Sequence, residues 1–256
     1  MTNDDGIYSP GIYSLWKVAK EFGSVFVVAP DSQKSAVGHS ITISKPLFID
    51  KVTRENGFKG FSISGSPADC VKIGIKKILD TKPDLVLSGV NLGSNLGNNI
   101  IYSGTIAGAM EGAMQDIPSI AFSLDSFNPD SFKTSNIVIR KLIKLAIENK
   151  IFKKNVWNVN IPNCTVEELK GFKATDQGGQ YFEDDFDARK DPKGNKYFWM
   201  TGEMIDNDNG GMETFKVYTA YEIYKMDQGF VWSGLNDHGF VTPKPVSYTH
   251  LRAHET

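Results

Sequence analysis

The segment that decides the fold is residues 1–11, which read MTNDDGIYSPG. It holds two adjacent carboxylates, Asp4 and Asp5, followed directly by Gly6. Side chains alternate between faces along a strand, so adjacent carboxylates can address one site only where a strand ends. Open α/β sheets bind ligands at the carboxyl ends of their strands. The segment therefore predicts a turn from strand to helix with an acidic site, which we interpret as a metal site.

Buried apolar runs alternate with amphipathic segments along residues 1–162. Helical spacing of apolar residues, or a small-residue helix, is found in the segments 10–22, 67–78, 103–114 and 132–148. Continuous apolar runs typical of parallel strands occupy 24–29, 83–88, 118–123 and 155–161. Short β-like runs, including 41–43 and 61–63, fall between residues 36 and 64. This order predicts a doubly wound, mostly parallel, Rossmann-like α/β sheet.

The composition changes after residue 162 to Asp, Gly, Asn, Lys and aromatic residues. We predict a catalytic core over 1–162, a β-rich hairpin extension over 163–245 and a tail over 246–256 that belongs to no folded element. The stretch 206–211 resembles a calcium loop but lacks a ligand at its fifth position and a glutamate at its twelfth, so we interpret it as a turn. Aromatic residues of the extension could stack a base, although they more often pack a sheet or an interface.

The composition excludes several classes of protein. The chain has 256 residues, 40% of them hydrophobic, and a net charge of −2, which gives no electrostatic basis for binding duplex nucleic acid. No apolar run is long enough to span a membrane, so no membrane partner is expected. Cys70 and Cys164 are too far apart to form a metal motif. We therefore expect a soluble cytoplasmic protein.

The histidines give no catalytic pattern. His39 and His238 lie in glycine-flanked loops, where we interpret them as loop residues and not as bases. His250 and His254 have the i, i+4 spacing of helical metal ligands, but no glutamate base lies between them and they belong to the tail. Neither a Ser-His-Asp nor a Cys-His arrangement is evident.

Oxygen-bearing side chains follow several predicted strands. In a doubly wound sheet the loops bearing Asp4-Asp5, Ser35, Asn91 and 103–105 should converge. Two carboxylates, a hydroxyl and an amide oxygen suit Mg²⁺ or Mn²⁺ better than zinc. The helix start at Ser103 could bind an anion, or could be an ordinary N-cap. Together these features predict metal-assisted hydrolysis of a phosphoester.

Several motifs resemble those of the SurE family, the metal-dependent nucleoside-monophosphate phosphatases. They are TNDDGI at 2–7, VAP at 28–30, GSPADCV at 65–71, SGVN at 88–91 and YSGT at 102–105. The resemblance covers about residues 2–162. It implies hydrolysis of nucleoside 5′- and 3′-monophosphates, in some members also of short polyphosphate, by homodimers or homotetramers built partly through the C-terminal β extension.

The resemblance also implies roles for individual residues. The expected ligands of one divalent ion per subunit are Asp4, Asp5, Ser35 and Asn91, and the two aspartates are also the expected catalytic residues. The expected phosphate-binding residues are Asn95, Ser103, Gly104 and Thr105.

Two departures from the family pattern carry expectations of their own. Only three residues precede Asp4, where family members have a short apolar strand, so we expect a nearly absent central strand and reduced stability or activity. Residues 239–243 only approximate the closing strand of the family, so oligomer assembly should also be affected.

Two alternatives remain. One is a different Mg²⁺ phosphatase that uses an aspartate nucleophile one residue removed from a second aspartate, an arrangement that the adjacent Asp4 and Asp5 argue against. The other is a module that binds nucleotides as a sensor and does not turn them over.

Overall fold

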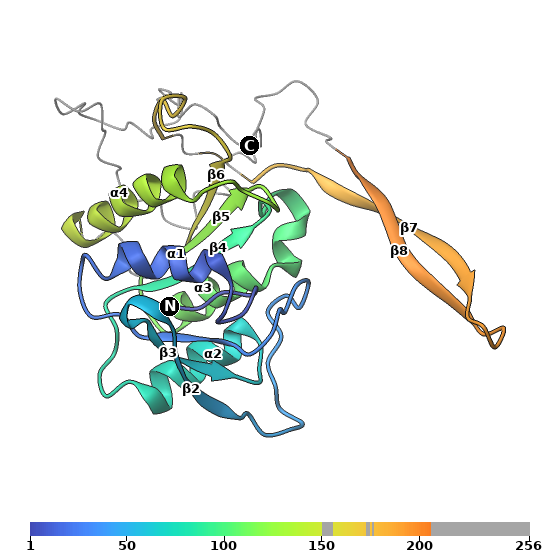
Figure 1. Cartoon of the computed structure of the whole chain (residues 1–256), viewed down its shortest axis with the longest axis horizontal. Helices are drawn as coiled ribbons and strands as arrows, with labels where there is room; N and C mark the ends of the chain where they lie inside the picture. The colour runs from blue at the N-terminus through green and yellow to red at the C-terminus, as the bar shows by residue number, and fades with distance from the viewer. Residues whose placement is uncertain (150–155, 173–174, 176, 206–256) are drawn as a thin grey trace, which may run out of the picture.

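The computed structural model describes residues 1–149, 156–172, 175 and 177–205 (Figure 1). Its helices are α1 (Pro10–Ala19), α2 (Pro67–Ile73), α3 (Gly104–Met114) and α4 (Lys133–Asn149), with the short turns η1 (Glu55–Gly57), η2 (Gly74–Ile78) and η3 (Gly97–Tyr102). Its strands are β1 (Val27–Pro30), β2 (Ile49–Thr53), β3 (Lys59–Ile63), β4 (Val86–Leu92), β5 (Ser119–Asp125), β6 (Val156–Pro162), β7 (Tyr181–Lys190) and β8 (Lys196–Ile205).

The core contains two three-stranded sheets, ordered β1-β3-β2 and β4-β5-β6, in which only β2 runs antiparallel to its neighbour. Met1 and Thr2 lie between them. The Val28 amide donates to the Met1 carbonyl at 2.9 Å, and the Thr2 amide donates to the Leu87 carbonyl at 2.9 Å. Thr2 also forms a parallel bridge with Ser88. The first residues of the chain thus join the two sheets and place Asp4 at their common carboxyl edge.

Helices cover both faces of β5 and its neighbours. Phe122 and Leu124 of β5 pack with α1 and α4, whereas Ala121, on the opposite face, packs against Ile106 and Ala109 of α3. Alternate side chains of one strand therefore enter two different helical layers, as the period of a strand requires. The predicted doubly wound, mostly parallel α/β fold is confirmed.

Helix α3 packs unusually close to the sheet through glycines spaced four residues apart. A Cβ atom at Gly104, Gly108 or Gly112 would lie 2.8 Å from Asp4 Cβ, 2.7 Å from Thr2 Cγ2 or 2.5 Å from Ser119 Oγ, respectively. Side chains would fill the space that the sheet occupies, which explains why a helix with poor intrinsic propensity has so many small residues. The start of α3 is thereby brought onto Asp4.

The predicted β-run at 41–43 is wrong, because the structure has no strand there. Ile43 is 83% exposed, and Thr42 instead bonds Asp69 through its amide at 2.9 Å and its hydroxyl at 2.7 Å. Asp69 also completes a capping box with Ser66 at the start of α2, as its position predicts. The strand β2 lies further along in the same region, whereas 61–63 is confirmed as part of β3.

The hairpin β7–β8 pairs antiparallel from Tyr181–Ile205 to Lys190–Lys196 and extends away from the core (Figure 1). It confirms a hairpin in the extension, although the domain limits stay predictions. The predictions for 206–211, 239–243, 246–256 and His238 lie outside the described residues. In the part of the chain that is described, none of the helices has the length and apolar character needed to cross a membrane.

Candidate active site

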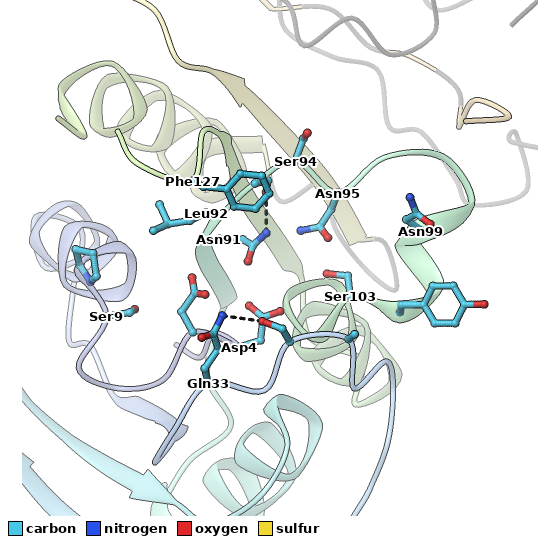
Figure 2. Close-up of a pocket in the computed structure, with 16 residues that line it drawn as sticks. Asp4, Ser9, Gln33, Asn91, Leu92, Ser94, Asn95, Asn99, Ser103 and Phe127 are labelled. Atoms are coloured by element: carbon cyan, nitrogen blue, oxygen red, sulfur yellow. Dashed lines mark hydrogen bonds between the residues drawn. The ribbon is translucent and has the colours of Figure 1, made fainter. Parts of the chain in front are cut away.

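A pocket of about 570 Å³ opens at the carboxyl ends of β1 and β4 (Figure 2). Its lining brings together side chains from the N-terminal turn, the loop after β1, the end of β4, the loop before η3 and the start of α3. The predicted site residues in this lining are Asp4, Asp5, Ser35, Asn91, Asn95 and Ser103. The other two predicted residues, Gly104 and Thr105, are not in the lining but lie against Asp4.

Asp4 is 5% exposed and is held by the start of α3. The Thr105 hydroxyl donates to Asp4 Oδ1, and Gly104 has no side chain to keep the helix away. Burial raises the pKa of Asp4, and the bonds from Thr105 and the Gly104 backbone oppose that shift. The structure thus gives Thr105 a contact with Asp4, while its expected contact with phosphate stays a prediction.

Asp5 has an unsatisfied oxygen. Its Oδ2 atom is buried and has no hydrogen-bond partner among the residues that the structure describes. Burial, and then the charge of Asp4, raise the pKa of Asp5 to about 6, against a backbone hydrogen bond at Leu92. Buried carboxylate oxygens normally have partners, so this pair forms an acceptor site that a cation would complete.

The loop that carries Ser35 is tied to Asp4. The Lys34 amide donates to the Asp4 carbonyl at 2.7 Å, which fixes the loop against the N-terminal turn. The Gln33 amide nitrogen donates to Ser35 Oγ at 2.8 Å, so the hydroxyl has one lone pair left for a ligand. Gln33 lines the pocket and was not expected from the sequence.

Asn91 lies after a register shift between β4 and β5. Its amide nitrogen donates to the Gly93 carbonyl at 2.7 Å. This bond directs the amide oxygen to the side that faces Asp4 (Figure 2). Asn91 therefore offers an oxygen to the same space as the two carboxylates.

Asn95 belongs to a loop but is fixed by two strands. Its backbone amide donates to Asn160 Oδ1 at 2.8 Å, its side-chain nitrogen donates to Ser123 Oγ at 2.7 Å, and Asn158 donates to its carbonyl at 2.9 Å. Sequence reasoning missed these supports. The available signal was the pair of asparagines, two residues apart, on an otherwise apolar strand.

The turn after Asp5 has its own supports, which sequence reasoning also missed. Asn3 donates to Ser9 Oγ at 2.8 Å from a fully buried position. Arg54 donates to the Ile7 carbonyl at 3.0 Å and the Ser9 carbonyl at 3.2 Å. A residue distant in sequence thus closes the turn that presents the carboxylates.

A buried carboxylate on α3 anchors the loop that follows Ser35. Glu111 is 1% exposed, and it contacts His39 Nε2 at 3.0 Å and Lys72 Nζ at 2.8 Å. Although burial raises the pKa of Glu111, the bonds from Lys72 and His39 bring it below its ordinary value. His39 lies in a loop, as expected, and its contact with Glu111 joins this loop to α3.

The donor set fits a hard divalent cation. Asp4, Asp5, Ser35 and Asn91 offer oxygen ligands, which suit Mg²⁺ or Mn²⁺. Zinc in proteins is bound mainly by cysteine and histidine, which this set of oxygen donors does not include.

Known proteins of one family match this chain in sequence and in structure. A profile of the family described as Survival protein SurE matches residues 1–184. The chain is 46% identical over 214 residues to 5′-nucleotidase SurE of Christiangramia forsetii, covering 82% of each chain, and 42% identical over 233 residues to that of Petrotoga mobilis, covering 90% and 89%. The crystal structure of the SurE protein from Aquifex aeolicus is similar, with a TM-score of 0.66 and 43% identity over 79% of this chain and 81% of that one. The chain belongs to the SurE family.

Proposed function

We propose that this protein is a divalent-metal-dependent phosphatase that hydrolyses nucleoside 5′- and 3′-monophosphates to nucleoside and phosphate, and also short polyphosphate. The observation that carries the proposal is the unpartnered buried Oδ2 of Asp5 beside Asp4, in a pocket that Ser35 and Asn91 also line. The names of the relatives, 5′-nucleotidase SurE, support the reaction at the 5′ position.

Asp4, Asp5, Ser35 and Asn91 would hold one Mg²⁺ or Mn²⁺ ion per subunit. Such an ion, when bound, polarises a phosphoryl oxygen and lowers the pKa of water. Thr105 keeps Asp4 oriented through its hydroxyl. Because the carboxylates are adjacent and both face the proposed ion, we assign the attack to water in preference to an aspartate.

Asn95 and Ser103 would bind the phosphate. Ser103 Oγ accepts the Ile106 amide at 3.2 Å, which leaves its own proton free to donate to a phosphate oxygen. One N–H of the Asn95 side chain bonds Ser123, and the second can reach into the pocket. Neutral donors here would complement the charge that develops on the phosphoryl oxygens.

Phosphate release from 5′-AMP, 3′-AMP, GMP and tripolyphosphate, with Mg²⁺ or Mn²⁺, tests the proposal. Asp4→Asn should abolish release and weaken Mn²⁺ binding in calorimetry, whereas Asp50→Asn, an exposed carboxylate on β2, should change neither. Release from 5′-AMP alone would restrict the proposal to 5′-nucleotides. Tight nucleotide binding without release under either ion would instead support a sensor module. A phosphorylated Asp4 or Asp5, trapped and seen by mass spectrometry, would contradict attack by water.

We also propose that the hairpin β7–β8 binds a second copy of this chain. It exposes large apolar side chains, and among the described residues its two strands pair only with each other. The side chains are Phe186, Phe198, Trp199, Met200 and Met204. A two-stranded hairpin is marginally stable alone, so a second copy that covers these side chains would stabilise it. We propose that the protein is cytoplasmic and that it forms a homodimer or a homotetramer. Sedimentation of the protein tests the oligomeric state.

A further inference from the structure

Two aromatic side chains stand on the lining of the otherwise largely polar pocket. Phe127 is 77% exposed and Tyr102 is 58% exposed, although both line the pocket that holds the acidic pair. Exposed aromatic rings beside a polar site offer a flat apolar surface to a ligand. One of them should therefore contact the part of the substrate that is neither phosphate nor sugar.

The Phe127 ring lies against the segment that carries Asn91. It rests on Gly93, where a Cβ atom would come within 2.7 Å of the ring atom Cε1 and 3.0 Å of Cζ. The Gly93 carbonyl accepts a hydrogen bond from the side-chain nitrogen of Asn91 at 2.7 Å, and the Gly93 amide donates to the Leu124 carbonyl at 2.8 Å. Figure 2 shows the ring beside Leu92, over Asn91. A short chain of contacts thus links the ring to the residue expected to hold the ion.

We propose that Phe127 is the platform on which the base of the nucleotide stacks. This inference rests on the proposed function and adds a preference for nucleotides over phosphomonoesters that lack a base. Every nucleobase has a π-face, so a phenyl ring without polar atoms would bind purines and pyrimidines with little discrimination. The aromatic residues of the hairpin, considered above as base-stacking candidates, do not line the pocket.

Phe127 is favoured over Tyr102 for two reasons. It is the more exposed of the two rings, and its backing by Gly93 leaves the other face available to a ligand. Tyr102 directly precedes Ser103 at the end of η3, so its position follows the expected phosphate-binding residue and not the metal ligand Asn91. Substitution of Phe127 and substitution of Tyr102 should therefore have different effects on the same substrate.

The test compares AMP with ribose 5-phosphate, which has the same sugar and phosphate but no base. In Phe127→Ala the ratio of kcat/KM for AMP to kcat/KM for ribose 5-phosphate should fall about tenfold, mainly through KM, which corresponds to about 1.4 kcal/mol. Phe127→Trp should retain the ratio, because indole also stacks. Phe48→Ala removes a ring that is 65% exposed and does not line the pocket, so it should leave both substrates unchanged.

An unchanged ratio in Phe127→Ala, or a fall in Tyr102→Ala alone, would overturn the inference. If the unmodified protein releases phosphate from neither substrate, the proposed function fails, and the inference is decided by calorimetry with Mn²⁺. A tenfold loss of AMP affinity relative to ribose 5-phosphate in Phe127→Ala would then sustain the platform. Equal losses for both ligands would reject it.

Discussion

Helix α3 and the hairpin β7–β8 differ in what holds their side chains in place. Most residues of α3 are buried, and its polar groups contact the N-terminal turn, the loop after β1 and α2. Nearly every residue of the hairpin is exposed, and within the described residues its strands pair only with each other. The side chains of α3 are therefore held by contacts between distant segments, whereas the structure of the hairpin depends on the pairing of its own two strands.

Replacing a glutamate by glutamine in each region should give the largest difference in stability between the two. Glu111→Gln removes the charge that His39 and Lys72 contact in a buried position, so the free energy of unfolding should fall by about 2 to 3 kcal/mol. Glu203→Gln on exposed β8 should change it by less than about 0.5 kcal/mol. Urea unfolding measures both. Equal losses would show that burial does not distinguish the two regions.

Adding one methyl group tests the packing. In Gly108→Ala the new Cβ atom would lie 2.7 Å from Thr2 Cγ2 and 2.9 Å from Ser88 Oγ, so overpacking should cost about 1 to 2 kcal/mol after the gain in helix propensity. Phosphate release should also fall, because Thr2 is close to Asp4 in the chain. Both changes are measured on one preparation, by urea unfolding and phosphate assay.

The matched variant is Gly194→Ala in the hairpin turn. Gly194 has φ +86° and open space around it, so alanine there meets only backbone strain of about 1 kcal/mol. That strain should not reach the pocket, and phosphate release should stay unchanged. A loss of activity in Gly194→Ala would mean that the turn communicates with the site.

Acid should weaken the core through Asp69. Although burial raises the pKa of Asp69, hydrogen bonds from Thr42 and Ser66 bring it below its ordinary value. Its contribution to stability is thus fully present above the unfolded pKa of about 3.9 and is lost as the pH falls through the folded pKa. Asp69→Asn should lower stability at pH 7 by about 1 kcal/mol and flatten the loss in acid, as measured by melting temperature against pH.

The exposed turn residue Asp191 gives the control. Hydrogen bonds within the turn, first from the Asn195 side chain, lower its pKa as well. Because these bonds are local, Asp191→Asn should leave the acid transition of the core unchanged. A shift equal to that of Asp69→Asn would contradict a purely local role for the turn.

The predictable part of the fold rests on periodicity. The apolar runs at 83–88, 118–123 and 155–161 overlap β4, β5 and β6, and the helical spacing from Pro10 located α1. Burial of a strand on both faces leaves such a local pattern. The strand predicted at 41–43 is wrong because its β-branched residues favour a strand only locally, whereas Thr42 forms a hydrogen bond with Asp69, which is distant in sequence. Local propensity does not record such a long-range competitor.

The site was predictable where the type of a residue itself indicates its chemistry. Asp4 and Asp5 form an acidic pair at a turn, and the loops after β1 and β4 converge as an open sheet requires. The supporting residues could not be found in this way. Arg54, Asn158 and Asn160 form hydrogen bonds with backbone atoms of distant segments. The two asparagines stand out on an apolar strand, but nothing in the sequence indicates which segment they contact.

The smallest effect on stability is expected in the hairpin. Trp199 is 59% exposed, so Trp199→Ser should change the free energy of unfolding of the isolated subunit by less than about 0.5 kcal/mol. If a second copy covers the hairpin, the same variant should sediment as a smaller species while releasing phosphate at an unchanged rate per subunit. A destabilised subunit with unchanged sedimentation would mean that Trp199 serves its own chain, and the contrast between α3 and the hairpin would then be one of degree only.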